Sequence, residues 1–144
     1  MHEGSRLEIS ISALPSAIAI VTDAVTRLLE ANHWPEQEIM AVELAVQEAV
    51  ANAIRHGCQN DPAKQVQCCV ACDDAGQITI VVRDPGSGFD HTSVPSPLEP
   101  GNELKPSGRG IFLINGLMDQ VGFADGGREL QMRKQRSSPT VLPE

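Results

Sequence analysis

The sequence predicts an α+β fold, a two-layer α/β sandwich in which helices lie on one face of a mixed, mainly antiparallel sheet. Segments with alternating apolar and polar residues come in pairs joined by short turns, which is typical of β-hairpins. Segments with helical periodicity are grouped beside these pairs instead of alternating with single strands, which favours segregated helices and strands. The 144 residues, 41% of them hydrophobic, suffice for one core, so we expect a single domain at 1–135 and a flexible tail at 136–144.

The first strand is predicted at residues 6–12 (RLEISIS), where apolar and polar side chains alternate. Pro15 ends this strand, and an amphipathic helix is predicted over residues 17–32. The apolar stripe of this helix consists of Ile20, Val21, Ala24, Leu28 and Ala31. Trp34 is expected to pack at the corner where this helix meets the next one.

A second helix is predicted from Pro35, which suits a first turn, to Gly57, which we expect to end the helix in a left-handed conformation. Its apolar stripe consists of Ile39, Val42, Val46, Ala49, Val50 and Ala53. The spacing of that stripe predicts that one face of the helix is buried against the core.

Two hairpins are predicted in the rest of the chain. Residues 65–72 and 77–83 are strand-like and are joined by an Asp-Asp-Ala-Gly turn. Residues 120–124 and 128–134 form the second pair, with a Gly-Gly turn between them. A short apolar helix is expected before this pair, at 111–118.

The composition excludes several classes of function. A net charge of −8 argues against nucleic acid as a direct partner, because phosphate binding needs a basic face. No apolar run approaches the roughly 20 residues of a membrane-spanning helix. The N-terminus also lacks the apolar core of a secretory signal, so we expect a cytoplasmic protein with no membrane partner.

The four cysteines are expected to be small buried hydrophobic residues. A disulfide framework is not expected in a cytoplasmic chain of this size. A zinc site made of Cys68, Cys69, Cys72 and His56 is an alternative. It is disfavoured because a strand would turn Cys69 away from the other two thiols.

The second helix carries a polar row that an ordinary buried helix would not need. Glu48, Asn52 and His56 follow one another at four-residue steps and therefore share one helix face. A solvated face would account for this row, although Asn is a poor residue for a helix interior. Alternatively, the amide oxygen of Asn52 binds Mg²⁺ together with phosphate oxygens, and Glu48 activates a nucleophile one turn away. His56 is expected to flank the helix end, where a cation is favoured.

Two glycine clusters follow in the sequence. In VRDPGSGF, a predicted strand ends just before Asp84, and Gly86 and Gly88 follow shortly after it. Either this is a simple turn, or the carboxylate accepts a hydrogen bond from an exocyclic amine while the glycines let a flat ring approach. In SGRGIFLI, Gly108 and Gly110 bracket an arginine directly before a helix, whose N-terminus favours phosphate. Neither cluster matches a Walker A loop or a dinucleotide-binding motif.

Between the two clusters the periodicity vanishes. Residues 84–110 hold five of the ten prolines and five of the twelve glycines. So long a segment without secondary structure is usually a lid, a binding loop or disorder, and we expect a lid at about 89–107. Taken together, each of these segments would serve one need of bound ATP. ExxxN would bind the metal ion, DxGxG the adenine and GxG the phosphates, and the long loop would cover the nucleotide.

This set of motifs resembles the ATPase superfamily of DNA gyrase, heat-shock chaperones, sensor histidine kinases and mismatch-repair proteins, which share the Bergerat or histidine-kinase-like ATPase fold. The N-box would be residues 48–52, and the two glycine boxes would be 84–88 and 108–110. Within the superfamily, EAVANAIRHG and GRGIFLINGLMDQV resemble the stand-alone bacterial anti-sigma factor serine-protein kinases, the anti-sigma regulatory factors. The resemblance covers about residues 7–134.

The resemblance implies a role for each motif residue. Glu48 would be the catalytic base, Asn52 the Mg²⁺ ligand and Asp84 the partner of the adenine amine. The other nucleotide contacts it implies are His56, Gly86, Gly88, Phe89, Ser107, Gly108, Arg109, Gly110 and Ile111. From its residue type alone, Phe89 would instead be a packing residue.

The resemblance also implies a function. The protein would be an ATP- and Mg²⁺-dependent serine kinase that sequesters a sigma factor, phosphorylates a serine on an anti-sigma factor antagonist and forms homodimers. Two alternatives stay open, namely a nucleotide-gated binding protein without kinase activity and an activator of another signalling enzyme. We expect neither a phosphoacceptor helix nor a further catalytic domain, which argues against a complete histidine kinase, gyrase subunit or chaperone.

Overall fold

A computed structural model describes residues 5–85 and 106–137, except for the side chains of residues 106–111. Nearly all of the expected lid therefore lies outside the described residues, and so does the expected tail beyond residue 137. Gly86, Gly88 and Phe89 of the first glycine cluster lie outside them as well.

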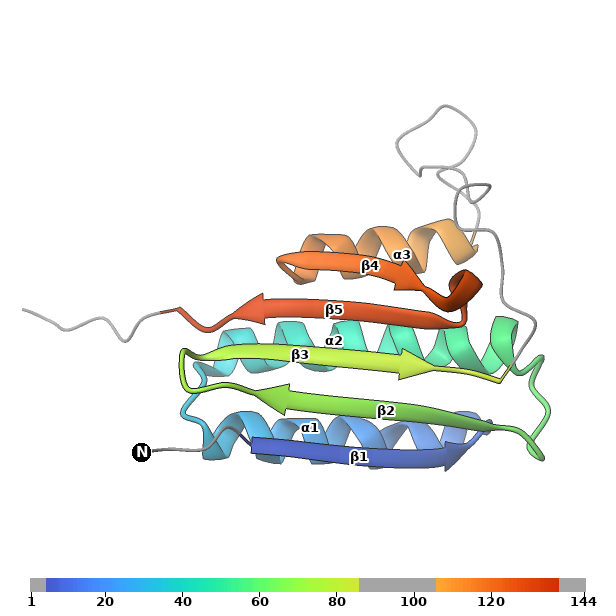
Figure 1. Ribbon diagram of the computed structural model, residues 1–144, viewed down its shortest axis with the longest axis horizontal. Helices are drawn as coiled ribbons and strands as arrows, with labels where there is room; N and C mark the ends of the chain where they lie inside the picture. The colour runs from blue at the N-terminus through green and yellow to red at the C-terminus, as the bar shows by residue number, and fades with distance from the viewer. Residues whose placement is uncertain (1–4, 86–105, 138–144) are drawn as a thin grey trace, which may run out of the picture.

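The strands form one five-stranded sheet in the order β1-β2-β3-β5-β4 (Figure 1). They are β1 (Ser5–Ser12), β2 (Gln65–Cys72), β3 (Gln77–Arg83), β4 (Gln120–Ala124) and β5 (Glu129–Gln135). Both predicted hairpins are present, because β2 pairs with β3 and β4 pairs with β5. Within the described residues every pairing is antiparallel, so this sheet is wholly antiparallel instead of mixed.

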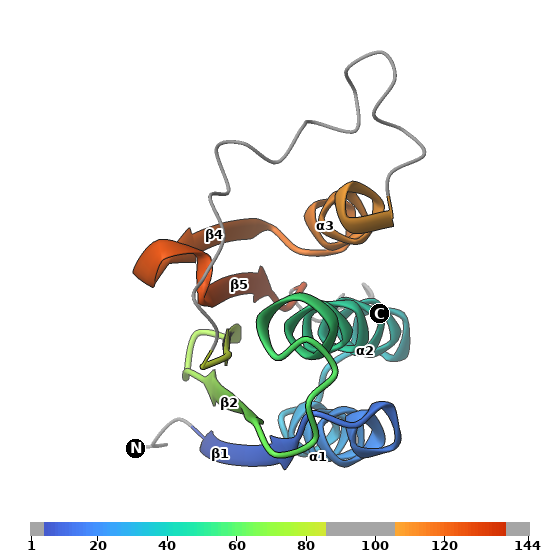
Figure 2. The same ribbon diagram turned by 90° about the vertical axis from the view of Figure 1, so that its right-hand side faces the viewer.

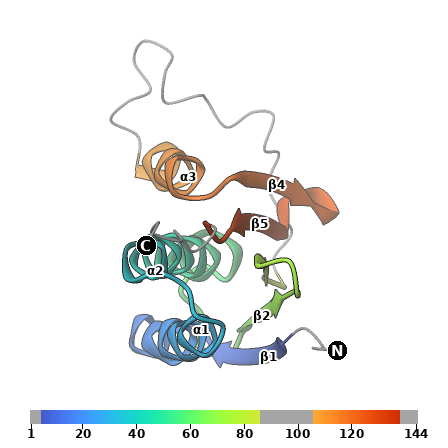
Figure 3. The same ribbon diagram turned by 90° about the vertical axis from the view of Figure 1, so that its left-hand side faces the viewer.

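The helices form the second layer. They are α1 (Ile18–Ala31), which follows the 3₁₀ turn η1 (Pro15–Ala17), α2 (Glu36–Asn52), which continues into the π-helical turn η2 (Ala53–Gly57), and α3 (Pro106–Leu117). A short turn, η3 (Asp125–Gly127), joins β4 to β5. The two end views show all three α-helices on one side of the sheet, with α2 between α1 and α3 (Figures 2 and 3). The predicted two-layer α+β architecture is therefore confirmed.

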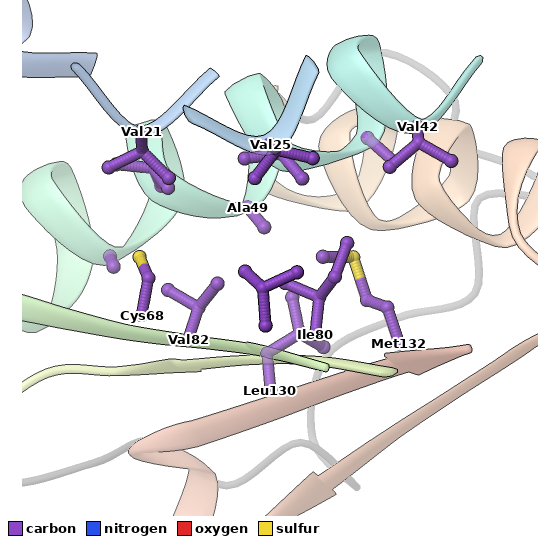
Figure 4. Close-up of a cluster of buried hydrophobic side chains, with 14 of the residues drawn as sticks. Val21, Val25, Val42, Ala49, Cys68, Ile80, Val82, Leu130 and Met132 are labelled. Atoms are coloured by element: carbon purple, nitrogen blue, oxygen red, sulfur yellow. The ribbon is translucent and has the colours of Figure 1, made fainter. Parts of the chain in front are cut away.

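The core fills the space between the two layers. Strand β2 buries every second residue, as its alternating sequence predicts, and β3 does the same. Figure 4 shows Val21, Val25, Val42 and Ala49 of the helices above Ile80, Val82, Leu130 and Met132 of the strands. Full burial of one such aliphatic side chain contributes about 1.5–3 kcal/mol, so this interface holds the helices in place.

The rotation of α1 differs from the prediction. Its buried residues are Val21, Val25 and Leu29, whereas Ile20 is 58% exposed and Ala31 is also exposed. Val21, Val25 and Leu29 lie at four-residue steps and share one face of the helix, and Ile20 lies outside that face. Packing against β1 and α2 selects the face. The stripe predicted for the second helix, by contrast, is buried at every position.

Three of the four cysteines are buried, as predicted, and Cys69 is only half-buried. Cys68 and Cys72 are buried on the core side of β2, and Cys69 faces the other way. Burial raises the pKa of the Cys68 thiol to about 12 and that of Cys72 to about 11, so both are neutral hydrophobic side chains at pH 7. Among the described residues, no cluster of His, Cys, Asp and Glu is arranged to hold a metal ion.

Trp34 packs at the corner between α1 and α2, as predicted, with only 5% of its surface exposed. None of the helices in the described ranges combines the length and the apolar character that crossing a lipid bilayer requires.

Candidate functional site

The burial of the apolar stripe of α2 determines where its polar row lies. Val46, Ala49 and Val50 are fully or almost fully buried, which fixes the rotation of the helix. Glu48 and Asn52 are consequently half-buried, because α2 packs against α1 on one side and α3 on the other. The polar row therefore begins at the margin of the core, and only His56 at its end is exposed.

The predicted left-handed glycine cap of the second helix was wrong. After Asn52 the chain widens into the π-helical turn Ala53–Gly57, which is closed by a 2.9 Å bond from the N–H of Cys58 to the carbonyl oxygen five residues earlier. Gln59 and Asn60 adopt the left-handed conformation instead, with φ of 53° and 58°. Single π-helical turns occur frequently at functional sites, and this one begins directly after the proposed metal ligand.

The amide of Asn52 has a cationic neighbour. Nη2 of the exposed Arg55 donates to Oδ1 of Asn52 at 2.9 Å. A hard divalent cation would use this same oxygen, because Mg²⁺ prefers oxygen ligands. A metal ion there would repel the guanidinium. Metal binding therefore requires Arg55 to turn toward solvent, which its exposure allows.

Asp84 lies where β3 leaves the sheet. Its N–H donates to the carbonyl oxygen of Arg128 at 3.0 Å, which fixes the direction of the strand end. Its carboxylate lies directly against Gly57, at the end of the π-helical turn. Burial raises the pKa of the adjacent Cys58 thiol, and the negative charge of Asp84 raises it further. The strand end and the helix end are thus in contact.

The second glycine cluster forms the first turns of α3, so the prediction that this helix begins at residue 111 was wrong. The helix begins at Pro106, in the position where proline fits best. Ser107, Gly108, Arg109, Gly110 and Ile111 follow within it. Each glycine weakens a helix by about 0.5–1 kcal/mol, and for this reason the pattern indicated a helix start after them. The first N–H groups of an α-helix have no partner within the helix, so those at the start of α3 can donate hydrogen bonds to an anion.

These three segments meet at one edge of the molecule. β3 ends, α2 ends and α3 begins on the same side in Figure 1, and Figure 2 views that edge directly. The segments that carry Asn52 and His56, Asp84, and residues 107–111 therefore end or begin at this edge, with Glu48 one turn further back along α2.

Two residues at this edge were not assigned a role from the sequence. Gly57 was interpreted as a cap, because a glycine at a helix end indicates left-handed backbone as readily as close contact. Arg55 lies beside the predicted polar row, but nothing in its spacing indicates a bond to Asn52.

Comparison with known proteins identifies relatives of the chain. Residues 11–134 match the histidine kinase-like ATPase domain family. The anti-sigma F factor of Oceanobacillus iheyensis is 37% identical over 111 residues, which are 73% of this chain and 75% of that protein. A protein of Halalkalibacterium halodurans named serine-protein kinase RsbW is 27% identical over 141 residues, covering 93% of this chain and 85% of the relative.

The serine-protein kinase RsbW of Staphylococcus epidermidis is 35% identical over 100 residues, which are 64% of this chain. The match spans 62% of the length of that relative. Among solved structures, the RsbU and RsbW domains of Rv1364c from Mycobacterium tuberculosis align with a TM-score of 0.67 at 18% identity, covering 94% of this chain and 33% of that chain. That likeness confirms the fold.

The family match covers most of the chain, and the resemblance inferred from the motifs is confirmed. The chain belongs to the histidine kinase-like ATPase domain family, together with the proteins named serine-protein kinase RsbW and anti-sigma F factor.

Proposed function

We propose that this protein binds ATP with Mg²⁺ at the edge formed by α2, β3 and α3, and transfers the γ-phosphoryl group to a serine of a partner protein. One observation carries the proposal. The helix that presents Glu48 and Asn52 one turn apart ends in contact with Asp84 and lies beside the start of α3. The residues to which we assign the base, the metal ligand, the adenine acceptor and the phosphate donors would thus form one continuous region.

Each residue would have a distinct task. The carboxylate of Asp84 would accept a hydrogen bond from the exocyclic amine of adenine, and the backbone N–H groups of residues 107–110 would bind the β- and γ-phosphates. The oxygen of Asn52 would hold the magnesium ion, which neutralises charge on the phosphates when it is bound. His56, Arg109 and Ile111 would border the nucleotide, as would Gly86, Gly88, Phe89 and Ser107 of the two glycine clusters.

Glu48 would act as the general base. Its carboxylate would accept the proton of the substrate serine hydroxyl while the serine oxygen bonds to the γ-phosphorus. The bond from that phosphorus to the β,γ-bridging oxygen breaks, and ADP leaves. The half-buried position of Glu48 suits this task, because partial shielding from water lets the serine hydroxyl bind the carboxylate with less competition from solvent.

The names of the relatives, serine-protein kinase RsbW and anti-sigma F factor, support the partners that the resemblance implies. The substrate would be an anti-sigma factor antagonist, and the protein would sequester a sigma factor from RNA polymerase in the cytoplasm, where sigma factors act. We propose in addition that two copies of the chain form a homodimer. Co-purification from the native host with and without ATP, followed by mass spectrometry, would identify these partners.

The test of the kinase activity uses γ-labelled ATP and the proteins that co-purify with the chain. Glu48→Gln should retain ATP binding and lose phosphotransfer by about 100-fold or more, because it removes the base and keeps the shape. Glu43→Gln, a similar change five residues earlier on the same helix, should retain activity. Transfer near the normal rate by Glu48→Gln would remove this residue from the role. ATP binding by the unchanged protein with no labelled serine would favour a nucleotide-gated binding protein.

A further inference from the structure

We infer that Gly57 is a positioning residue for base recognition, because only glycine leaves room for the carboxylate of Asp84 to lie against the end of the α2–η2 helix. The inference rests on the proposed ATP site. It adds that the preference for a purine with a 6-amino group depends on this glycine as well as on the aspartate.

The contact between the two residues is exceptionally close. A Cβ atom added to Gly57 would overlap three atoms of the Asp84 side chain, namely Cγ, Oδ1 and Oδ2. Real Cβ atoms do not approach other atoms so closely, so one of the two residues would have to move. Every other side chain at position 57 would begin with the same Cβ, and the requirement therefore selects glycine alone.

Backbone conformation does not explain this glycine. The glycines with positive φ in the described ranges are Gly76, Gly126 and Gly127, and Gly57 is not among them. An alanine could adopt the backbone angles of Gly57 without strain. The reason for glycine at this position is therefore the space that Asp84 occupies.

The backbones on both sides of the contact are anchored. On the helix side, Ile54 and Cys58 have 1% and 0% exposure, so the π-helical turn is fixed in the core. On the strand side, Val82 is 2% exposed and the N–H of Asp84 is bonded to the carbonyl oxygen of Arg128. A close-packed core moves little when one methyl group is added. The side chain of Asp84 would therefore have to rotate away.

Rotation of Asp84 has a consequence for the bound base. A carboxylate only accepts hydrogen bonds, so it attracts the 6-amino group of adenine and repels a 6-carbonyl oxygen. A displaced carboxylate loses both effects. Adenine nucleotides should then bind more weakly, while nucleotides with a 6-carbonyl group should bind no more weakly than before.

The experiment measures the affinities of ATP and of inosine triphosphate, in the presence of Mg²⁺, by calorimetry. The unchanged protein should prefer ATP. Gly57→Ala should bind ATP about tenfold more weakly or worse, the range expected for a hydrogen bond to a charged group, and should bind inosine triphosphate as before. The matched control is Gly116→Ala in α3, where an added Cβ meets nothing within 4 Å, and it should retain the preference for ATP.

A double variant tests whether Gly57 acts through Asp84. Asp84→Gly removes the whole side chain and makes room for the methyl group. In this background Gly57→Ala should lower neither the ATP affinity nor the melting temperature any further. This comparison decides the matter even if the single variant Gly57→Ala fails to fold.

The outcomes separate the inference from the proposed function. If the unchanged protein binds neither nucleotide, the proposed ATP site is wrong and the inference fails with it. If ATP binds and Gly57→Ala keeps its preference, or weakens both nucleotides equally, the ATP site stands and the positioning role is overturned. A further loss in the double variant also overturns it.

Discussion

The bond between Arg55 and Asn52 predicts that this arginine opposes metal binding. Nη2 of Arg55 lies 2.9 Å from Oδ1 of Asn52, the oxygen that we assign to Mg²⁺. Arg55→Ala should therefore lower the Mg²⁺ concentration at which ATP binding is half-maximal. The exposed position of Arg55 limits the effect, because water competes for its guanidinium.

Arg55 opposes metal binding in two ways, and its removal relieves both. A solvent-exposed bond to a charged group contributes about 0.5–1 kcal/mol, and releasing the oxygen from it should lower the half-maximal Mg²⁺ concentration about two- to fivefold. Two unit charges 4 Å apart in water interact by about 1 kcal/mol, so the guanidinium also repels the metal ion. The negative triphosphate beside the metal offsets that repulsion, and we keep the hydrogen-bond figure as the expected change.

The assay titrates Mg²⁺ at a fixed ATP concentration and follows nucleotide binding by calorimetry. Arg27→Ala is the control, because it removes the same charge from an exposed position on α1. Asn52→Ala should abolish the metal dependence. The reasoning is refuted if Arg55→Ala raises the half-maximal Mg²⁺ concentration, since the guanidinium would then assist the phosphates, or if Arg27→Ala produces the same shift.

Two further predictions concern the core. Leu29→Ala should lower the free energy of unfolding by about 2–5 kcal/mol in urea titrations, because Leu29 is fully buried. Ile20→Ala on the same helix should change the free energy of unfolding by less than about 1 kcal/mol, because Ile20 is exposed. Equal effects of the two variants would contradict the observed rotation of α1. The pKa of the Cys68 thiol is raised from 9.0 to about 12 in the folded protein, so the folded state holds this proton more tightly than the unfolded state does. The stabilisation that results is complete below pH 9 and is lost as the pH rises toward 12. Cys68→Ala should make the decline of the unfolding free energy above pH 9 less steep, and an unchanged slope would exclude the thiol as its cause.

Periodicity in the sequence was sufficient for most of the fold. The strands at 65–72 and 77–83 begin with alternating polar and apolar residues and continue as apolar runs, and their predicted bounds agree with β2 and β3. The stripe of α2 was also predicted correctly, although the apolar Met40 and Leu44 of the same helix are exposed. In α1 the buried residues Val21, Val25 and Leu29 lie at four-residue steps, and the prediction wrongly included the exposed Ile20 and Ala31. Both helices carry apolar residues outside the buried face, so contacts with other elements decide which residues are buried.

The candidate site was predictable only as far as its motifs are local. Glu48 and Asn52 are four residues apart on one helix, so their common face follows from helical geometry. The contact between Gly57 and Asp84 joins residues on different elements, and no periodic pattern records it. The start of α3 was missed for a different reason, because two glycines lower the local helix propensity and packing against α2 overrides that preference.

The same helix serves the core and the site, and this links stability to function in the protein. The buried residues of α2 fix its rotation, and that rotation leaves Glu48 and Asn52 half-buried. Successive residues of a helix differ by about 100° in direction, so a rotation of α2 of that size would present other residues in place of Glu48 and Asn52. Substitutions at buried positions of α2 should therefore weaken nucleotide binding even where the domain stays folded, whereas substitutions in the core of α1 should lower stability without changing the preference for adenine.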